Sequence, residues 1–172
     1  MKELSNIKIK INIIYRNYNK KDHPNEIIKI RDFCKKRGFR LFLSNNFKLA
    51  NRLDLDGVYL PAFNKNINLK NLTIKKNFQI IGSAHNISEL KIKENQNCKE
   101  IFISPLFKTN KTINYLDVVK FNIIAKETNK MIIGLGGINL KNLRKLNLTK
   151  SIGVASISWI KKNGLNKNLG RF

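Results

Sequence analysis

Small residues follow two predicted strands near the end of the chain, where they could hold a phosphate group. Gly136 and Gly137 end one apolar run, and Ser156, Ile157 and Ser158 end the next. Glycine and serine at a strand's carboxyl end allow backbone N–H groups to turn toward an anion. We therefore predict a phosphate site formed by these residues. The alternative is that the glycines only make a tight turn.

Polar residues also follow the earlier predicted strands. Ser83 and His85 come after one of them, and Asn45 comes after another. In folds that alternate strands and helices, ligands bind at the carboxyl ends of the strands. His85 is one of two histidines in the chain. Acid–base catalysis and a structural hydrogen bond to a neighbouring loop are both open for it.

Short β-rich runs alternate with helical patterns along the chain. This alternation predicts an α/β fold with parallel strands joined by helices. The seven runs that we count are Ile9–Tyr15, Phe39–Leu43, Gly57–Leu60, Phe78–Gly82, Ile101–Ser104, Met131–Leu135 and Ile152–Ile157.

Helical patterns lie between these runs. Apolar residues at near-helical spacing predict a helix over residues 25–36, and Asn86 has the position of a helix N-cap. Val118 and Ile124 mark another helix. We expect one domain over residues 1–160, followed by a polar tail or short helix over residues 161–172.

Charge is the strongest signal in the composition. The 34 Lys and Arg residues against 11 Asp and Glu residues give a formal net charge of +23. Such a charge attracts nucleic acid, anionic lipid or phosphorylated metabolites. The lysines are spread along the whole chain without a stripe of stacking aromatic residues, so nucleic acid is not the partner that we expect.

The cysteines and the hydropathy pattern point to a cytoplasmic protein. Cys34 and Cys98 belong to no C-x-x-C or Cys/His cluster, which predicts two reduced structural thiols. No run approaches the ~20 apolar residues of a membrane helix, and the N-terminus leads into no signal-peptide core. We expect no membrane partner.

Five segments together carry a resemblance to a known family. The segments are Asp56–Leu60, Ile81–Asn86, Ser104–Thr109, Gly134–Asn139 and Gly153–Ser158. In order and spacing they resemble thiamine phosphate synthase and its thiazole tautomerase relatives, the TMP-TENI family. The resemblance implies a TIM-type (β/α)₈ barrel. The first run here corresponds to the family's second strand, so the family's first strand is missing.

The resemblance also implies roles for single residues. Arg16 matches the arginine that faces a pyrimidine diphosphate, and its guanidinium suits phosphate oxygens. Ser83 and Thr109 match residues that contact substrate, and Lys111 lies one position before the family's diphosphate-binding lysine. Ser83 as the cap of the helix near Asn86, and Lys111 as a solvated surface lysine, are the alternatives.

Departures from the family pattern concern its metal and its acid–base chemistry. The family's two acidic Mg²⁺ ligands correspond to Asn45 and Asn64. Since amides offer only a neutral oxygen, we expect much weaker Mg²⁺ binding. Pro105 stands where the tautomerases have their catalytic histidine, and Tyr59 stands where the synthases have a histidine. Tautomerase activity is therefore not expected.

These observations favour two functions over a third, a basic RNA-associating domain, because the predicted phosphate loops are retained. The first is a thiamine phosphate synthase-like transferase that couples hydroxymethylpyrimidine diphosphate with thiazole phosphate and releases diphosphate. Arg16 would stabilise the diphosphate, Ser83 and Thr109 would orient substrates, and Gly137, Ile157 and Ser158 would hold the thiazole phosphate. The second is a catalytically silent binding protein for thiazole phosphate or a similar ligand. The sequence leaves the oligomeric state open, and a homo-oligomer is one possibility.

Overall fold

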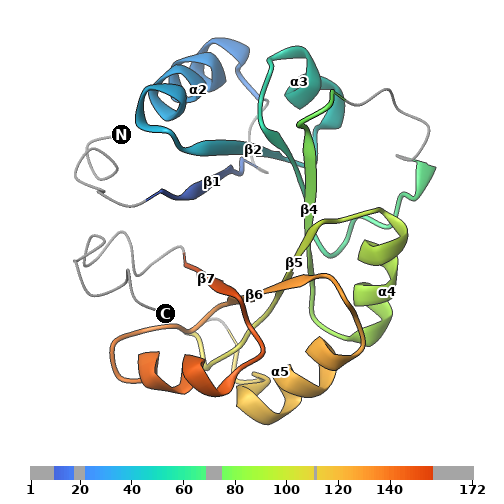
Figure 1. Ribbon diagram of the computed structural model, residues 1–172, viewed down its shortest axis with the longest axis vertical. Coiled ribbons are helices and arrows are strands. Elements are labelled where there is room, and N and C mark those ends of the chain that lie inside the picture. Colours follow the sequence, from blue (N-terminus) through green and yellow to red (C-terminus); the bar gives the residue numbers. More distant parts are fainter. Residues whose placement is uncertain (1–9, 18–21, 69–74, 111, 157–172) are drawn as a thin grey trace.

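Seven parallel strands form one curled sheet in the computed structural model, which describes residues 10–17, 22–68, 75–110 and 112–156 (Figure 1). Each strand pairs with the next in chain order. The strands are β1 (Asn12–Tyr15), β2 (Arg40–Ser44), β3 (Gly57–Leu60), β4 (Gln79–Ala84), β5 (Glu100–Ile103), β6 (Met131–Leu135) and β7 (Gly153–Ala155). This order confirms a TIM-like α/β fold, with seven parallel barrel strands in the described residues.

Helices cover the outer face of the curled sheet (Figure 1). They are α2 (Pro24–Arg37), α3 (Phe47–Arg52), α4 (Ile87–Asn95), α5 (Asp117–Lys126) and a 3₁₀ helix, η2 (Leu143–Leu148). The structure confirms the three predicted helices and adds α3 and η2, which the sequence did not indicate. Their six-residue lengths are too short to display a helical repeat.

The strand boundaries differ from the prediction by a few residues. β1 begins at Asn12, and Ile9 lies outside the described residues. β4 continues to Ala84, beyond the predicted end at Gly82. β7 ends at Ala155, while Ile157 and the expected tail over residues 161–172 lie outside the described part of the chain.

Hydrophobic residues pack on both faces of the sheet. Alternate residues of β2 show this, because Leu41 and Leu43 pack toward the helices while Phe42 packs inside the curl. The inner cluster joins Phe42 to Tyr59 and Phe102, and all three are nearly inaccessible to solvent. A strand buried on both faces needs a continuous apolar run, which is what its sequence shows.

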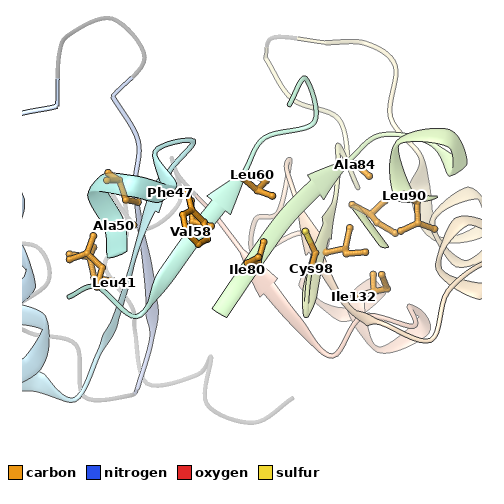
Figure 2. Packing of buried hydrophobic residues seen from close by; sticks show 14 of the residues in the cluster. Leu41, Phe47, Ala50, Val58, Leu60, Ile80, Ala84, Leu90, Cys98 and Ile132 are labelled. Carbon is orange, nitrogen blue, oxygen red and sulfur yellow. The ribbon is translucent and has the colours of Figure 1, made fainter. Parts of the chain in front are cut away.

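The outer cluster fixes the helices against the sheet (Figure 2). Phe47 and Ala50 of α3 lie beside Val58 of β3. The Asn46 side chain caps this short helix by accepting a hydrogen bond from the Leu49 N–H, at 3.2 Å. No helix in the described ranges is long and apolar enough to cross a membrane.

The two edge strands, β1 and β7, border a single cavity of about 690 Å³. Ile11 and Ile14 line it from the first edge, and Val154 and Ala155 from the last. The curl of the sheet brings both edges to one side of the molecule, at the left of Figure 1. In the described residues, the sheet is therefore an open barrel with a seam between β1 and β7.

Candidate functional site

The predicted site residues lie at one edge of the sheet. Because all seven strands are parallel, their carboxyl ends meet at the same edge. The residues that follow six different strands are Arg16, Asn45, Asn64, Thr109, Gly136, Gly137 and Ser156, and Ser83 is the penultimate residue of β4. Lys111, Ile157 and Ser158 lie outside the described residues.

Gly136 and Gly137 adopt positive φ angles of 93° and 72° after β6. A Cβ atom on Gly137 would lie 2.2 Å from the Phe107 carbonyl oxygen, so only glycine fits there. The Gly137 carbonyl oxygen accepts hydrogen bonds from the side chains of Asn139 and Asn142. The pair therefore packs closely against the loop after β5, as the tight-turn alternative requires, while phosphate binding there stays a prediction.

Ser83 points into the curl of the sheet, where it is 4% exposed. The Tyr59 hydroxyl donates to Ser83 Oγ at 2.8 Å, and the Tyr59 ring packs edge-on against Phe102. The alternative that Ser83 caps α4 is wrong, because Asn86 Oδ1 accepts the Glu89 N–H at 2.9 Å. Tyr59 was not predicted as a site residue, and its replacement of the family's histidine was the available signal.

Arg16 and Thr109 lie at the carboxyl ends of other strands. Arg16 is exposed at the carboxyl end of β1 and lines the cavity at the seam. Thr109 lies in the loop after β5, where its Oγ1 accepts the Thr112 N–H at 3.2 Å. Ser83, Thr109 and the glycines do not line that cavity, which reaches to Lys10 and Glu100 at the opposite edge. The cavity thus runs along the bore of the open barrel, and Arg16 and Ser156 line it at the carboxyl edge.

His85 pairs with the first turn of α4. Its Nδ1 lies 2.9 Å from Glu89 Oε2, and the same carboxylate accepts the His85 backbone N–H at 2.7 Å. The structural alternative predicted a bond to a neighbouring loop, whereas the partner is the helix that follows His85 directly. About half of the His85 side chain is exposed.

A hydrogen-bonded network connects the side-chain amides of Asn45 and Asn64 to two fully buried residues. These are Lys93 of α4 and Gln96, which caps the C-terminus of that helix. Asn64 Nδ2 donates to Asn45 Oδ1 at 2.7 Å. Lys93 Nζ donates to the Asn64 backbone oxygen at 2.7 Å, and Gln96 Nε2 donates to Asn64 Oδ1 at 3.2 Å. Burial lowers the pKa of Lys93 because desolvation disfavours its charged form. Neither Lys93 nor Gln96 was predicted, because a lysine within a lysine-rich helix resembles a solvated surface residue.

Asn45 and Asn64 would be the ligands of the Mg²⁺ that the resemblance implies. Mg²⁺ prefers anionic oxygens in a near-octahedral shell. Here Asn45 Oδ1 accepts from Asn64, and Asn64 Oδ1 accepts from both Gln96 and the Asn66 N–H. No group of three or more acidic, histidine or cysteine side chains suited to a metal occurs among the described residues. The residues present do not fit Mg²⁺.

A family model and two of the curated relatives that match this chain carry the name thiamine monophosphate synthase or thiamine-phosphate synthase. A family model described as Thiamine monophosphate synthase matches residues 4–160. A thiamine-phosphate synthase of Pelagibacter ubique is 31% identical over 169 residues, covering 93% of this chain and 80% of that protein. One from Prochlorococcus marinus subsp. pastoris is 30% identical over 152 residues, which cover 85% of this chain and 41% of that protein. The chain thus spans about two fifths of the Prochlorococcus relative.

Solved structures agree with the fold. Thiamine phosphate pyrophosphorylase from Pyrococcus furiosus superimposes with a TM-score of 0.69 at 19% identity, covering 91% of this chain and 75% of that one. At this identity the likeness concerns the barrel architecture alone.

Proposed function

This chain belongs to the thiamine monophosphate synthase family, and we propose that it couples hydroxymethylpyrimidine diphosphate with thiazole phosphate. In this reaction the thiazole nitrogen forms a bond to the pyrimidine methylene carbon. The bond from that carbon to the diphosphate oxygen breaks, and its electron pair leaves with the diphosphate. The observation that supports the proposal is that Arg16, Ser83, Thr109 and Gly137 share one edge of the sheet.

Arg16 would bind the departing diphosphate. Its guanidinium is exposed at the carboxyl end of β1 and carries a permanent positive charge. A forked donor of this kind matches two phosphate oxygens at once, and the interaction strengthens as negative charge develops on the leaving group. Arg16 would therefore favour the transition state over the bound substrate.

Ser83 and Thr109 would orient the two rings. The Ser83 hydroxyl accepts from Tyr59, so its own proton can be donated to a substrate atom above it. The edge-on contact of Tyr59 with Phe102 holds that donor in place. The glycine pair after β6, with Ile157 and Ser158 farther along the chain, would hold the thiazole phosphate, and Lys111 would add a second cation for the diphosphate.

Silent binding of a phosphorylated ligand is the second candidate. The interlocked amides of Asn45 and Asn64 favour it, because the family chemistry would use acidic residues there to hold Mg²⁺. No step proposed for this chain passes through a metal. The two candidates share the ligand and differ only in turnover.

Diphosphate release from the two substrates tests the proposal directly. Changing Arg16→Met should lower kcat/KM for the pyrimidine diphosphate by about 10-fold to 100-fold, since a charge-assisted hydrogen bond contributes about 1.5–3 kcal/mol. Arg52→Met, at an exposed arginine that ends α3, is the matched control and should leave the rate unchanged.

An NMR titration of the amide resonances, together with the diphosphate-release assay, separates the synthase from the silent binding protein. Titration with thiazole phosphate should shift the Gly137 N–H in either case. Binding of both substrates without diphosphate release would select the silent protein. Failure of thiazole phosphate to bind at millimolar concentration would contradict both.

A further inference from the structure

Lys93 begins a chain of hydrogen bonds that all run in one direction. The side chain is fully buried, and an ammonium group can only donate. Its Nζ donates to the carbonyl oxygens of Pro61 and Asn64, at 2.8 and 2.7 Å, and to Gln96 Oε1 at 2.8 Å. Three acceptors satisfy the three N–H groups, so this charge is tolerated inside the protein.

The Gln96 amide is oriented by Lys93 and in turn donates toward Asn64. Because Gln96 Oε1 faces the lysine, its Nε2 faces the loop after β3. There its two N–H groups lie within hydrogen-bond distance of three acceptors: the Asn66 and Asn64 carbonyl oxygens, at 2.9 and 3.0 Å, and Asn64 Oδ1, at 3.2 Å. The Asn66 N–H also donates to Asn64 Oδ1, at 2.9 Å. A flipped Asn64 amide would place its NH₂ group against two donors. Asn64 Oδ1 must therefore point inward and Asn64 Nδ2 outward.

Asn45 is the outer end of the chain of hydrogen bonds. Its Oδ1 accepts from Asn64 Nδ2 at 2.7 Å, so its own Nδ2 is directed away from that contact. Asn45 Nδ2 has no hydrogen-bond partner among the residues that the structure describes, and the side chain is exposed at the carboxyl edge. The two donors that converge on Asn64 Oδ1 thus make the accessible end of the network a donor, and the buried ammonium orients one of these two, Gln96. A donor attracts an anion and repels a cation.

We propose that Asn45 and Asn64 form a metal-independent binding site for diphosphate oxygens, with Lys93 and Gln96 as the positioning residues. Asn45 Nδ2 would donate directly to an oxygen that a divalent cation would otherwise hold. Arg16 follows the neighbouring strand, since Tyr15 of β1 is in register with Leu43 of β2, so a second donor lies at the adjacent strand end. The nearby Asp22 carboxylate accepts from Asn46 Nδ2 at 2.9 Å.

This inference rests on the proposed function only for its ligand, a diphosphate. Inorganic diphosphate is therefore the probe, added to the full ¹⁵N-labelled chain in EDTA. The expected result is binding without a divalent cation, with a shift of the Asn45 side-chain NH₂ resonances. Binding that appears only after Mg²⁺ is added would overturn the inference, and so would the absence of binding at millimolar diphosphate. Thiazole phosphate and the Gly137 N–H report on the proposed function separately.

Asn45→Asp replaces the donor by a carboxylate of the same shape. The variant should weaken diphosphate binding at least tenfold, because an acceptor with a negative charge then faces the anion. Asn97→Asp is the matched control, since Asn97 is also exposed with a left-handed backbone, at φ 58° against 59° for Asn45, but precedes β5 at the opposite edge. Its effect should stay below threefold at 0.15 M salt, where charges farther apart than about 8 Å are screened. Equal effects of the two variants would overturn the inference.

Lys93→Met tests the positioning role. Without the ammonium, the Gln96 amide loses the group that orients it, so the Asn66 N–H alone holds Asn64 Oδ1, and the Asn45 NH₂ resonances should broaden or split. Diphosphate affinity should fall at least fivefold. Lys91→Met, which removes an exposed lysine from the same helix, should change neither. A folded Lys93→Met variant with unchanged affinity would refute the positioning role, and if this variant does not fold, Asn45→Asp still decides the site.

Discussion

At the scale of single residues, buried ionisable groups lie between the sheet and α4. Cys98 and Lys93 both pack against Gly82, where an added Cβ would lie 2.9 Å from the thiol sulfur and 2.8 Å from Lys93 Cδ. Burial lowers the pKa of Lys93 and raises the pKa of Cys98. Lys93 keeps its hydrogen bonds to three oxygens, whereas the Cys98 thiol is stable inside only while it is neutral.

The Cys98 thiol makes stability fall at alkaline pH. Burial raises its pKa to about 12, while an unfolded cysteine has a pKa of about 8.5. Its contribution is complete below about pH 8.5 and is lost as the pH rises toward 12, because only the unfolded chain ionises in that window. At pH 10 the loss is about 2 kcal/mol.

Urea unfolding at pH 8 and pH 10 measures this loss. In Cys98→Ala, the fall in the free energy of unfolding between the two pH values should be smaller by about 2 kcal/mol. Cys34, whose pKa burial raises to about 11, remains in both proteins and cancels in the comparison. An identical fall in both proteins would show that the thiol does not contribute.

At the scale of elements, the turn after β6 is fixed by contact with the loop after β5. The Leu106 N–H donates to the Leu135 carbonyl oxygen at 2.8 Å, and the Phe107 N–H donates to that of Gly136 at 3.0 Å. These bonds bring the backbone of Gly137 against Phe107. Backbone hydrogen bonds therefore join the turn after β6 to the loop that carries Thr109.

Two glycine substitutions separate backbone strain from crowding. Gly38 and Gly137 both have positive φ angles, of 66° and 72°, but a Cβ on Gly38 would meet no atom within 4 Å. Gly38→Ala should cost only the left-handed backbone penalty, about 1–2 kcal/mol. Gly137→Ala should cost about 1–3 kcal/mol more, because the Phe107 backbone must shift. Chemical denaturation of both variants measures the difference, and equal losses would contradict the close approach.

At the scale of the whole molecule, the strands that border the open seam are less buried than the strands at the centre of the sheet. β3 is buried along its whole length, whereas β7 has only three residues, all of them partly or largely exposed. β1 and β7 each pair with one neighbouring strand within the described residues. Edge strands of this kind have fewer contacts to lose when they open.

Native-state hydrogen exchange should show this difference. Amides of β3, β4 and β5 should exchange with a free energy close to that of global unfolding. Amides of β1 and β7 should exchange by local opening, at a free energy lower by at least about 2 kcal/mol. Uniform protection across all seven strands would mean that the seam is closed in solution.

The pattern along the chain was sufficient to predict the seven parallel strands, three of the helices and the family. Apolar runs such as Gly57–Leu60 report burial on both faces, and Asn86 carries its capping chemistry in its own side chain. These signals are local, so they can be read without knowing what lies across the sheet. Parallel strands also place every strand-end residue at one edge, which is why Arg16 and Thr109 could be assigned to it.

Only the tertiary structure decided how those residues are oriented and which others support them. Lys93 is 29 residues from Asn64, and Tyr59 is 24 residues from Ser83, so neither contact leaves a periodic signal in the sequence. The direction in which an asparagine amide points depends on the donors packed against it, and here those donors are the Asn66 N–H of the same loop and the Gln96 side chain at the end of α4. Residue type placed Asn45 at the site, whereas the hydrogen bonds from Asn66 and Gln96 to the Asn64 side chain determined that Asn45 presents a donor.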